Sequence, residues 1–381
     1  MTVTLRSLET AVPDTELAQE ELRDVFLAQE DLSRLGSRLV ATSFNSSGID
    51  RRFSAVHEWD PDPGGTDPVF FDPTSRQFLN PTTGARNAVF AREATELYIR
   101  SAAAALEAAE GIEAADVTHV ITVSCTGFFA PGPDYRIVRA LGLDPSTQRY
   151  HLGFMGCYAA FPALRQAQTI CQADPNAVVI VVSVELCTLH VRTSNDPDTI
   201  VGSSLFADGA AAAVITGRDL PSTTPILRLD HFETVLTPVG EEAMAWNIGD
   251  NGFEMVLGTY VPHIIDEHIV EALRPLIARD PSLENLPYRD IEHWAIHPGG
   301  RSILDKVEAK LGLTAEQLEP PRETLRDYGN MSSATVMFVL RNILDRAAPG
   351  IEQRVCGMAF GPGLTVETGL MTTIGAPEES A

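Results

Sequence analysis

The sequence predicts a duplicated α/β fold of five layers, α/β/α/β/α, with pseudo-two-fold symmetry. The first observation behind this prediction is an approximate internal repeat. In each copy a strand precedes a helix: SCTG at Ser124 is followed by a helix that opens at Cys157, and HPGG at His297 by one that opens at Asn330. His297 follows Ser124 by 173 residues, and Asn330 follows Cys157 by the same 173.

The second observation is a set of nearly continuous apolar strands. Residues 117–123 (VTHVITV), 177–184 (AVVIVVSV) and 354–361 contain few polar side chains. Such runs are typical of strands that helices cover on both faces. We therefore expect two similar halves, residues 1–220 and 221–381, each built from one copy of the repeat.

The repeat also predicts where functional residues meet. If the halves pack about a pseudo-dyad, their buried central helices begin near the centre of the molecule. Cys157 from the first half would then lie close to His297 and Asn330 from the second. These three residues are the candidate catalytic residues.

Composition excludes several classes of protein. The chain has 381 residues, 44% of them hydrophobic, which is enough for a large core. Its formal net charge of −24 repels nucleic acid and anionic membrane surfaces. The N-terminus lacks the pattern of a secretory signal, and the 5 cysteines form no C-x-x-C pair. We expect a cytoplasmic protein with free thiols and no bound metal.

Cys157 is the candidate nucleophile. Gly153 and Gly156 permit a tight turn before it, and the alanine-rich run after it favours a helix. A thiol at a helix N-terminus meets the positive end of the helix dipole, which favours the thiolate. Taken alone, a cysteine in an apolar stretch is more typical of an inert core residue.

His297 and Asn330 supply polar groups that fit such a thiolate. His297 ends an apolar strand, where α/β proteins display catalytic groups. Its spacing from His293 resembles a metal pair, but the sequence has no third ligand or H-E-x-x-H helix. Asn330 fits a helix N-cap equally well. Together, a thiolate, an imidazole and an amide could bind a thioester and stabilise negative charge on its oxygen.

Five motifs then carry a specific resemblance. The Gly-Cys helix start, HPGG, YGNMSSA, SLFADGAAA and FGPGLTVE resemble, in order and spacing, the chalcone synthase-like type III polyketide synthases of the thiolase superfamily, bacterial members included. The resemblance implies that Cys157 carries the acyl chain as a thioester. It also implies that His297 and Asn330 bind malonyl-CoA for decarboxylation. No separate cofactor is implied, because the coenzyme A thioesters are substrates.

The resemblance further implies a set of pocket residues. Phe206 falls at a gatekeeper position between the coenzyme A tunnel and the cavity, and Met255 and Trp246 replace a phenylalanine and a glycine of the plant enzymes. The other residues assigned to the pocket are Cys125, Cys187, His190, Ser332, Gly361, Pro362 and Gly363.

The basic residues that hold coenzyme A in the plant enzymes have no clear counterpart here. The nearest candidates for this contact are Arg38, Arg51, Arg52 and Ser302. SGIDRRF also resembles a segment of β-ketoacyl synthase III enzymes, so delivery of the starter by a carrier protein stays open. The family resemblance implies a homodimer.

Three alternatives remain at this point. A single-step β-ketoacyl synthase III-like enzyme would use the same Cys, His and Asn but condense once. A Cys-His hydrolase would release an acyl group from Cys157 to water. A binding protein on an inactive scaffold would need none of the three residues, although all of them are intact.

Overall fold

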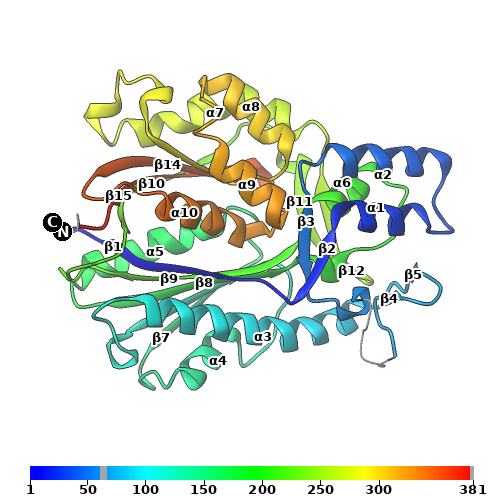
Figure 1. The fold of residues 1–381 in the computed structure, drawn as a ribbon, viewed down its shortest axis with the longest axis horizontal. Helices are drawn as coiled ribbons and strands as arrows, with labels where there is room; N and C mark the ends of the chain where they lie inside the picture. Colours follow the sequence, from blue (N-terminus) through cyan, green and yellow to red (C-terminus); the bar gives the residue numbers. More distant parts are fainter. Residues whose placement is uncertain (61–66, 378–381) are drawn as a thin grey trace.

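The computed structural model describes residues 1–60 and 67–377. Its helices and strands form five layers, which Figure 1 shows edge-on: helices, strands, helices, strands and helices. This arrangement confirms the predicted α/β fold. The strands of both halves belong to one nine-stranded sheet, in the order β13-β14-β15-β10-β1-β9-β8-β6-β7.

The two halves of this sheet repeat one topology. In the first half, β9 is antiparallel to β1 and β8, and β6 runs parallel to β8 and β7. In the second half, β15 is antiparallel to β10 and β14, and β13 runs parallel to β14. The first set is β1 (Thr4–Ala11), β6 (His119–Ser124), β7 (Gln148–Gly153), β8 (Val178–Leu186) and β9 (Asp208–Thr216). The second is β10 (Ile226–Leu236), β13 (His293–Ile296), β14 (Glu352–Gly361) and β15 (Thr365–Ile374).

A short ladder joins the two sets. β1 pairs with β10 only through Thr4 with Arg228 and Leu5 with Leu227. Residues 217–225 connect β9 to β10 along the chain, and the predicted boundary between residues 220 and 221 falls in this connection. The layers can therefore diverge away from the ladder and leave room for helices between them.

Two central helices fill that space, and others cover the outside. The central pair is α5 (Ala160–Ala173) and α10 (Thr335–Asp345). One outer layer in Figure 1 contains α3 (Thr83–Ala108) and α4 (Pro133–Ala140), and the other contains α7 (Val261–Ile277) and α8 (Arg301–Leu311). Because they lie between two sheet faces, α5 and α10 present buried side chains all around their first turns.

Phe161 shows how tightly α5 packs on the second half. Its ring lies over Gly357 of β14 and Gly369 of β15, where a Cβ atom would come within 2.9 and 3.0 Å of the ring. Both strands therefore need glycine at this crossing. Full burial of the ring stabilises the fold by roughly 1.5–3 kcal/mol and holds the helix that follows Cys157 against β14 and β15.

A group of smaller elements gathers at one end of the layers. These elements cover the end at which β8, β13 and β14 finish, which positions the site described below. They are α1 (Gln19–Leu27), α2 (Arg34–Ser46), α6 (Pro197–Leu205), α9 (Glu319–Tyr328), β2 (Thr15–Ala18), β3 (Arg51–Ser54), β4 (Phe71–Asp72), β5 (Gln77–Phe78), β11 (Met244–Gly249) and β12 (Gly252–Leu257). Short 3-10 helices include η3 (Cys187–His190), η7 (Ser332–Ala334) and η8 (Pro362–Leu364).

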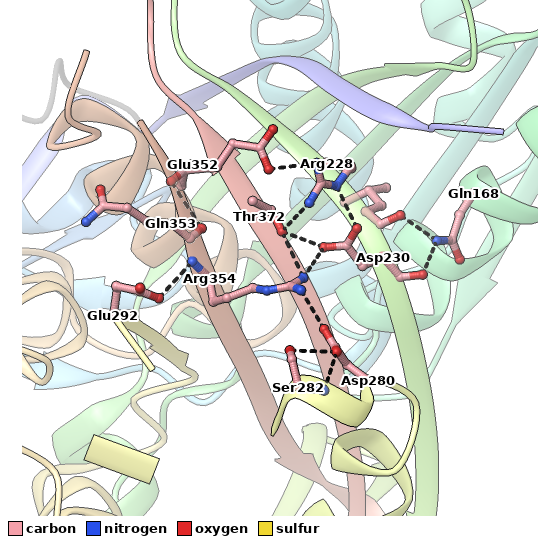
Figure 2. Close-up of polar contacts among 12 residues, drawn as sticks. Gln168, Arg228, Asp230, Asp280, Ser282, Glu292, Glu352, Gln353, Arg354 and Thr372 are labelled. Carbon is pink, nitrogen blue, oxygen red and sulfur yellow. Dashed lines mark hydrogen bonds and ion pairs between the residues drawn. The ribbon is translucent and has the colours of Figure 1, made fainter. Parts of the chain in front are cut away.

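A polar cluster ties the second set of strands together at the opposite end (Figure 2). Arg228 of β10 bonds Asp230 at 2.8 Å, and Thr372 of β15 donates to Asp230 at 2.7 Å. Arg354 of β14 reaches Asp280, beyond α7, at 2.5 Å. Seven residues of extended strand, ~23 Å, separate Arg354 from Gly361 at the other end of β14. The cluster therefore supports the sheet and takes no part in the candidate site.

Within residues 1–60 and 67–377, no helix combines the length and the apolar character that a bilayer span needs.

Candidate active site

Cys157, His297 and Asn330 line one cavity. Each comes from a segment at the end of a strand or the start of a central helix, so the fold brings the two halves together here as the repeat predicts. The rest of the wall is largely apolar and includes Met244, Leu257, Ile303 and Phe360. All three polar side chains are at most 9% exposed. A molecule in the cavity would be shielded from bulk water.

Cys157 lies in the turn that leads into α5. Gly156 has φ of +77°, and a Cβ atom there would fall 2.4 Å from Cδ of Pro362. Glycine therefore permits both the turn and the close approach of the loop that contains Pro362. Pro162 is the third residue of α5, within the first turn, where it removes no helical hydrogen bond.

Asn330 precedes α10 by five residues and is held by a strand-like bridge to Phe206. Its backbone N–H donates to Leu205 O, and its carbonyl accepts from Ala207 N–H, both at 2.9 Å. In its side chain, Oδ1 accepts from the Ser332 N–H at 2.9 Å, and Nδ2 is 3.3 Å from Gly299 O. The amide is thus oriented by its neighbours rather than by helix capping of α10 alone.

His297 follows β13 directly and is 1% exposed. Neither ring nitrogen has a hydrogen-bond partner among the described residues. Burial lowers the pKa of His297 to about 3, so the ring is neutral near pH 7 and keeps one N–H donor. A buried imidazole without partners costs stability, and a bound polar ligand would remove that cost.

The protonation state of Cys157 differs from the expectation. Burial raises its pKa to about 12, although hydrogen bonds from Ser332 and Asn330 act in the opposite direction. The helix dipole was predicted to favour a thiolate, but desolvation in this enclosed cavity is the larger effect. With this pKa, the thiol form of Cys157 is the favoured one at neutral pH.

The other assigned pocket residues are divided between two cavities. Cys125, Phe206, Trp246, Met255, Ser332 and Pro362 line the first cavity with the three candidate catalytic residues. Cys187 and His190 line a second cavity. Gly361 and Gly363 flank Pro362 but line neither; a Cβ at Gly361 would fall 2.4 Å from Tyr158. Phe206, Trp246 and Met255 belong to both cavities and form the wall between them.

Trp246 is the largest side chain in this wall, and its Nε1 donates to Cys125 O at 2.7 Å. We expect Trp246→Gly to join the two cavities and so to change the starter preference or the length of the product. Mass spectrometry of the products would detect the change, with Trp246→Phe as the control that keeps an aromatic ring in the wall. An unchanged product profile in Trp246→Gly would show that the wall does not limit the chain.

His190 is a structural residue of the second cavity. Its Nε2 bonds Thr126 O at 2.8 Å, and its Nδ1 accepts from Phe253 N–H at 2.9 Å, which fixes one neutral tautomer. The ring stacks on Phe253 with the ring centroids 4.3 Å apart. Burial lowers the pKa of His190 to about 3.

This pKa predicts a pH dependence of folding stability. The folded pKa lies below the unfolded value, so on acidification the unfolded chain binds the proton first and stability is lost below about pH 6.5. For His190 alone the loss at pH 5 is about 2 kcal/mol. Denaturant unfolding at pH 8 and pH 5 should therefore show a smaller difference in His190→Gln than in the wild type. Equal differences would contradict a buried neutral ring.

The four residues assigned to coenzyme A have different environments. Arg38 on α2 and Ser302 on α8 are exposed, and Arg51 has a 45% exposed side chain that lies 3.8 Å from Glu16. Arg52 is 1% exposed and donates to backbone carbonyls, so its assignment to a solvent-facing phosphate contact is wrong. Arg301, an exposed residue that was not among the four candidates, lies against Gly48 at the start of α8.

Glu185, a fully buried carboxyl group next to the cavity, was not among the predicted site residues. Glu185 accepts from Ser333 Oγ at 2.5 Å, from the Cys125 N–H at 2.9 Å and from Thr126 Oγ1 at 2.9 Å. Burial raises its pKa. A signal was present, because this glutamate interrupts a nearly continuous apolar run, where a charged residue needs buried partners.

Comparison with known proteins agrees with this geometry. A family model described as chalcone and stilbene synthases, N-terminal domain, matches residues 2–219, and the C-terminal domain model of the same family matches residues 229–375. Among solved structures, PKS-I from the brown alga Ectocarpus siliculosus is 28% identical, with a TM-score of 0.88 and 98% of each chain covered.

Two further structures are similarly close. The C-terminal type III polyketide synthase domain of Steely1 from Dictyostelium is 26% identical, with a TM-score of 0.89, over 98% of this chain and 100% of that one. The 1,3,6,8-tetrahydroxynaphthalene synthase of Streptomyces coelicolor is 26% identical, with a TM-score of 0.82, over 99% of this chain and 100% of that one. A single-step β-ketoacyl synthase III-like enzyme is not favoured by these matches. The chain belongs to the chalcone and stilbene synthase family and is a type III polyketide synthase, a condensing acyltransferase.

Proposed function

We propose that Cys157 carries the growing acyl chain and that His297 and Asn330 bind malonyl-CoA for decarboxylation. The observation that supports this assignment is the meeting of the three side chains, one thiol and two potential hydrogen-bond donors, in a single enclosed cavity. The cavity is mostly apolar, which suits an acyl chain.

The first step is transfer of the starter. The Cys157 sulfur attacks the carbonyl carbon of an acyl-CoA, its proton passes to His297, and the bond to the coenzyme A sulfur breaks. Coenzyme A leaves as a thiol once it takes that proton. A thiolate and an imidazolium in the same cavity would attract each other, which would offset part of the cost of burying each charge.

The second step is decarboxylation and condensation. The carboxylate of malonyl-CoA leaves as carbon dioxide, and the electron pair of the broken C–C bond forms an enolate. A ring N–H of neutral His297 and the amide of Asn330 donate to the enolate oxygen. The enolate carbon attacks the acyl-Cys157 carbonyl and releases the thiolate, which then takes the lengthened chain from coenzyme A for another round.

Cyclisation and release complete the proposal. Phe206 and Met255 would control passage between the coenzyme A tunnel and the cavity, and the Gly361–Gly363 loop would shape the space for ring closure. Arg38, Arg51 and Ser302 remain candidates for the coenzyme A contact, with Arg301 added from its position beside Gly48. The starter, the number of rounds and the mode of ring closure depend on the cavity shape.

A homodimer and a cytoplasmic location belong to the same proposal. Within the described part of the chain β7 pairs only with β6, and its first four residues, Gln148–His151, are exposed. Such an open strand edge can pair with a second copy of the chain. The cytoplasmic location is supported by the coenzyme A thioesters it would use and by five unpaired cysteines, typical of a reducing compartment.

The test is incubation of the purified protein with malonyl-CoA and a panel of acyl-CoA starters, with products identified by mass. We expect starters extended by more than one two-carbon unit. A product extended once only would favour a single-step condensing enzyme. Release of free acid with rapid loss of label from Cys157 would favour a hydrolase. The absence of any ketide product from every starter would reject the proposed function.

A further inference from the structure

Arg52 is an arginine enclosed in the protein interior beside the candidate site, and the reaction proposed above gives it no role. It lies on β3, is 1% exposed, and its guanidinium carbon is 5.6 Å from the centroid of the Phe44 ring. Its Nη1 donates to two backbone carbonyls, Ser203 O at 2.9 Å and Phe206 O at 2.7 Å. Nε and Nη2 have no partner among the described residues.

Both acceptors belong to the C-terminus of α6. The last carbonyls of a helix lack intrahelical partners and carry the negative end of the helix dipole. Three residues supply the donors here. Arg52 donates to the carbonyls of Ser203 and Phe206. Gln19 Nε2 donates to Ser204 O, and the Asn330 N–H donates to Leu205 O, both at 2.9 Å. The C-terminus of α6, next to Phe206, therefore also holds the backbone of Asn330 through the Leu205 carbonyl.

Arg52 contacts the Asn330 segment directly as well. A Cβ atom at Gly329, which has φ of +71°, would fall 2.9 Å from Cγ and 3.0 Å from Cδ of Arg52. The aliphatic part of Arg52 thus packs against the residue that precedes Asn330. Asp208, buried two residues after Phe206, attracts the guanidinium electrostatically and is itself held by the N–H groups of Ala55 and Thr188.

Packing alone does not account for an arginine at this position. A methionine would fill similar space without burying a cation that has two unpartnered donor atoms, and replacing buried charges by apolar side chains is often neutral or stabilising. The guanidinium instead satisfies two helix-terminal carbonyls at the junction of the two halves.

We propose that Arg52 is a positioning residue, which fixes the Phe206–Asn330 bridge and thereby aims the Asn330 amide into the cavity. Arg52 touches no substrate; it acts through the bridge, whose two hydrogen bonds join Asn330 to Leu205 and Ala207. The effect of Arg52 on decarboxylation rests on the proposed role of Asn330. The statement that Arg52 fixes the Phe206–Asn330 bridge does not depend on that role.

The kinetic test measures malonyl-CoA decarboxylation per folded protein in Arg52→Met and Arg52→Lys. Displacement of a catalytic group by about 1 Å can cost about 10²-fold, so we expect kcat to fall by about 10–10² in Arg52→Met, with KM little changed. Arg52→Lys keeps a cation for the carbonyls and should recover part of the rate. Arg52→Lys also serves if Arg52→Met does not fold.

Arg86 offers a matched control. It is also fully buried and donates to the backbone carbonyls of Pro81, Leu189 and Val191, and none of its hydrogen-bond partners among the described residues belongs to the Phe206–Asn330 bridge. Arg86→Met should lower thermal stability while decarboxylation per folded protein stays within about twofold. An equal loss of decarboxylation in Arg86→Met and Arg52→Met would overturn the inference, since a general loss of packing would then explain both.

A double-mutant cycle tests whether Arg52 acts through Asn330. In an Asn330→Ala background, Arg52→Met should lower the remaining decarboxylation by less than about twofold. The same fold loss in both backgrounds would show that Arg52 acts by another route and would overturn the inference.

Amide hydrogen exchange tests the geometry without any activity. Peptides that contain Ala207 and Asn330 should exchange faster in Arg52→Met than in the wild type, and should be unchanged in Arg86→Met. Unchanged exchange in Arg52→Met would overturn the positioning role. If the wild type itself does not decarboxylate malonyl-CoA, the proposed function fails, and the exchange result still decides whether Arg52 fixes the bridge.

Discussion

Cys157→Ala is expected to abolish transfer of the starter and formation of every ketide product while malonyl-CoA decarboxylation continues. The reason is a division of roles: the sulfur is the only group proposed to bond to the acyl chain, whereas the proposed donors to the enolate oxygen are on His297 and Asn330. Intact-protein mass spectrometry would measure the acyl adduct, and release of labelled carbon dioxide would measure decarboxylation.

The controls for this prediction are the other thiols. Cys171 lies on α5, the helix that follows Cys157, and its sulfur faces the backbone carbonyls of Ala177 and Ile215 rather than the cavity. Cys171→Ala should retain both the adduct and the products. Cys125 Sγ lies 3.3 Å from Ser332 Oγ in the cavity. Comparing the acyl adduct of Cys125→Ala with that of the wild type therefore tests whether this second thiol accepts part of the chain. An acyl adduct that persists in Cys157→Ala would contradict the assignment of the nucleophile.

The repeat was sufficient to predict the fold and the meeting of the candidate residues. β6 and β13 end at corresponding positions, and α5 and α10 occupy the central layer together. The spacing of 173 residues holds both for the ends of the two strands and for the starts of the two helices. Equal spacing restricts how the two copies can pack, because the hydrophobic strands and helices must bury the same faces in each copy. This is why residues 173 positions apart in the sequence could be placed near one another.

The different environments of Arg51 and Arg52 could not be predicted in the same way. They are neighbours on β3, where successive side chains point to opposite faces, so Arg51 is exposed and Arg52 is buried. The strand is only four residues long, and no alternation in the surrounding sequence identified it. Without that assignment, two adjacent arginines looked equally available to a phosphate.

The protonation state of Cys157 is a second property that could not be predicted from the sequence. The sequence places a thiol before a helix, and the dipole of that helix favours the thiolate by a small amount. How deeply the thiol is buried depends on side chains contributed from both halves, among them Phe206 and Met255, which pack beside it. Desolvation is therefore a property of the assembled cavity, and here it raises the pKa of Cys157 to about 12.

Asn330→Ala is expected to lower malonyl-CoA decarboxylation by ~10²–10³, the usual effect of removing one donor to a developing oxyanion. The bridge to Leu205 and Ala207 uses only the backbone of Asn330, so the variant should fold, with a loss of about 1–3 kcal/mol from the unpaired Ser332 N–H. The rate loss should appear in kcat, because the charge on the oxygen forms only as carbon dioxide leaves.

Asn342→Ala is the matched control for this variant. Asn342 lies on α10, the helix that follows Asn330, and its Nδ2 donates to Glu323 at 3.0 Å, so its loss tests the effect of removing a nearby asparagine amide outside the cavity. It should decarboxylate at the wild-type rate. Asn330→Ala should also still acquire an acyl group on Cys157, although more slowly, since its amide contacts the thiol. If Asn330→Ala released carbon dioxide at the rate of Asn342→Ala, the Asn330 amide would not stabilise the enolate oxygen, and His297 would be the only proposed donor left.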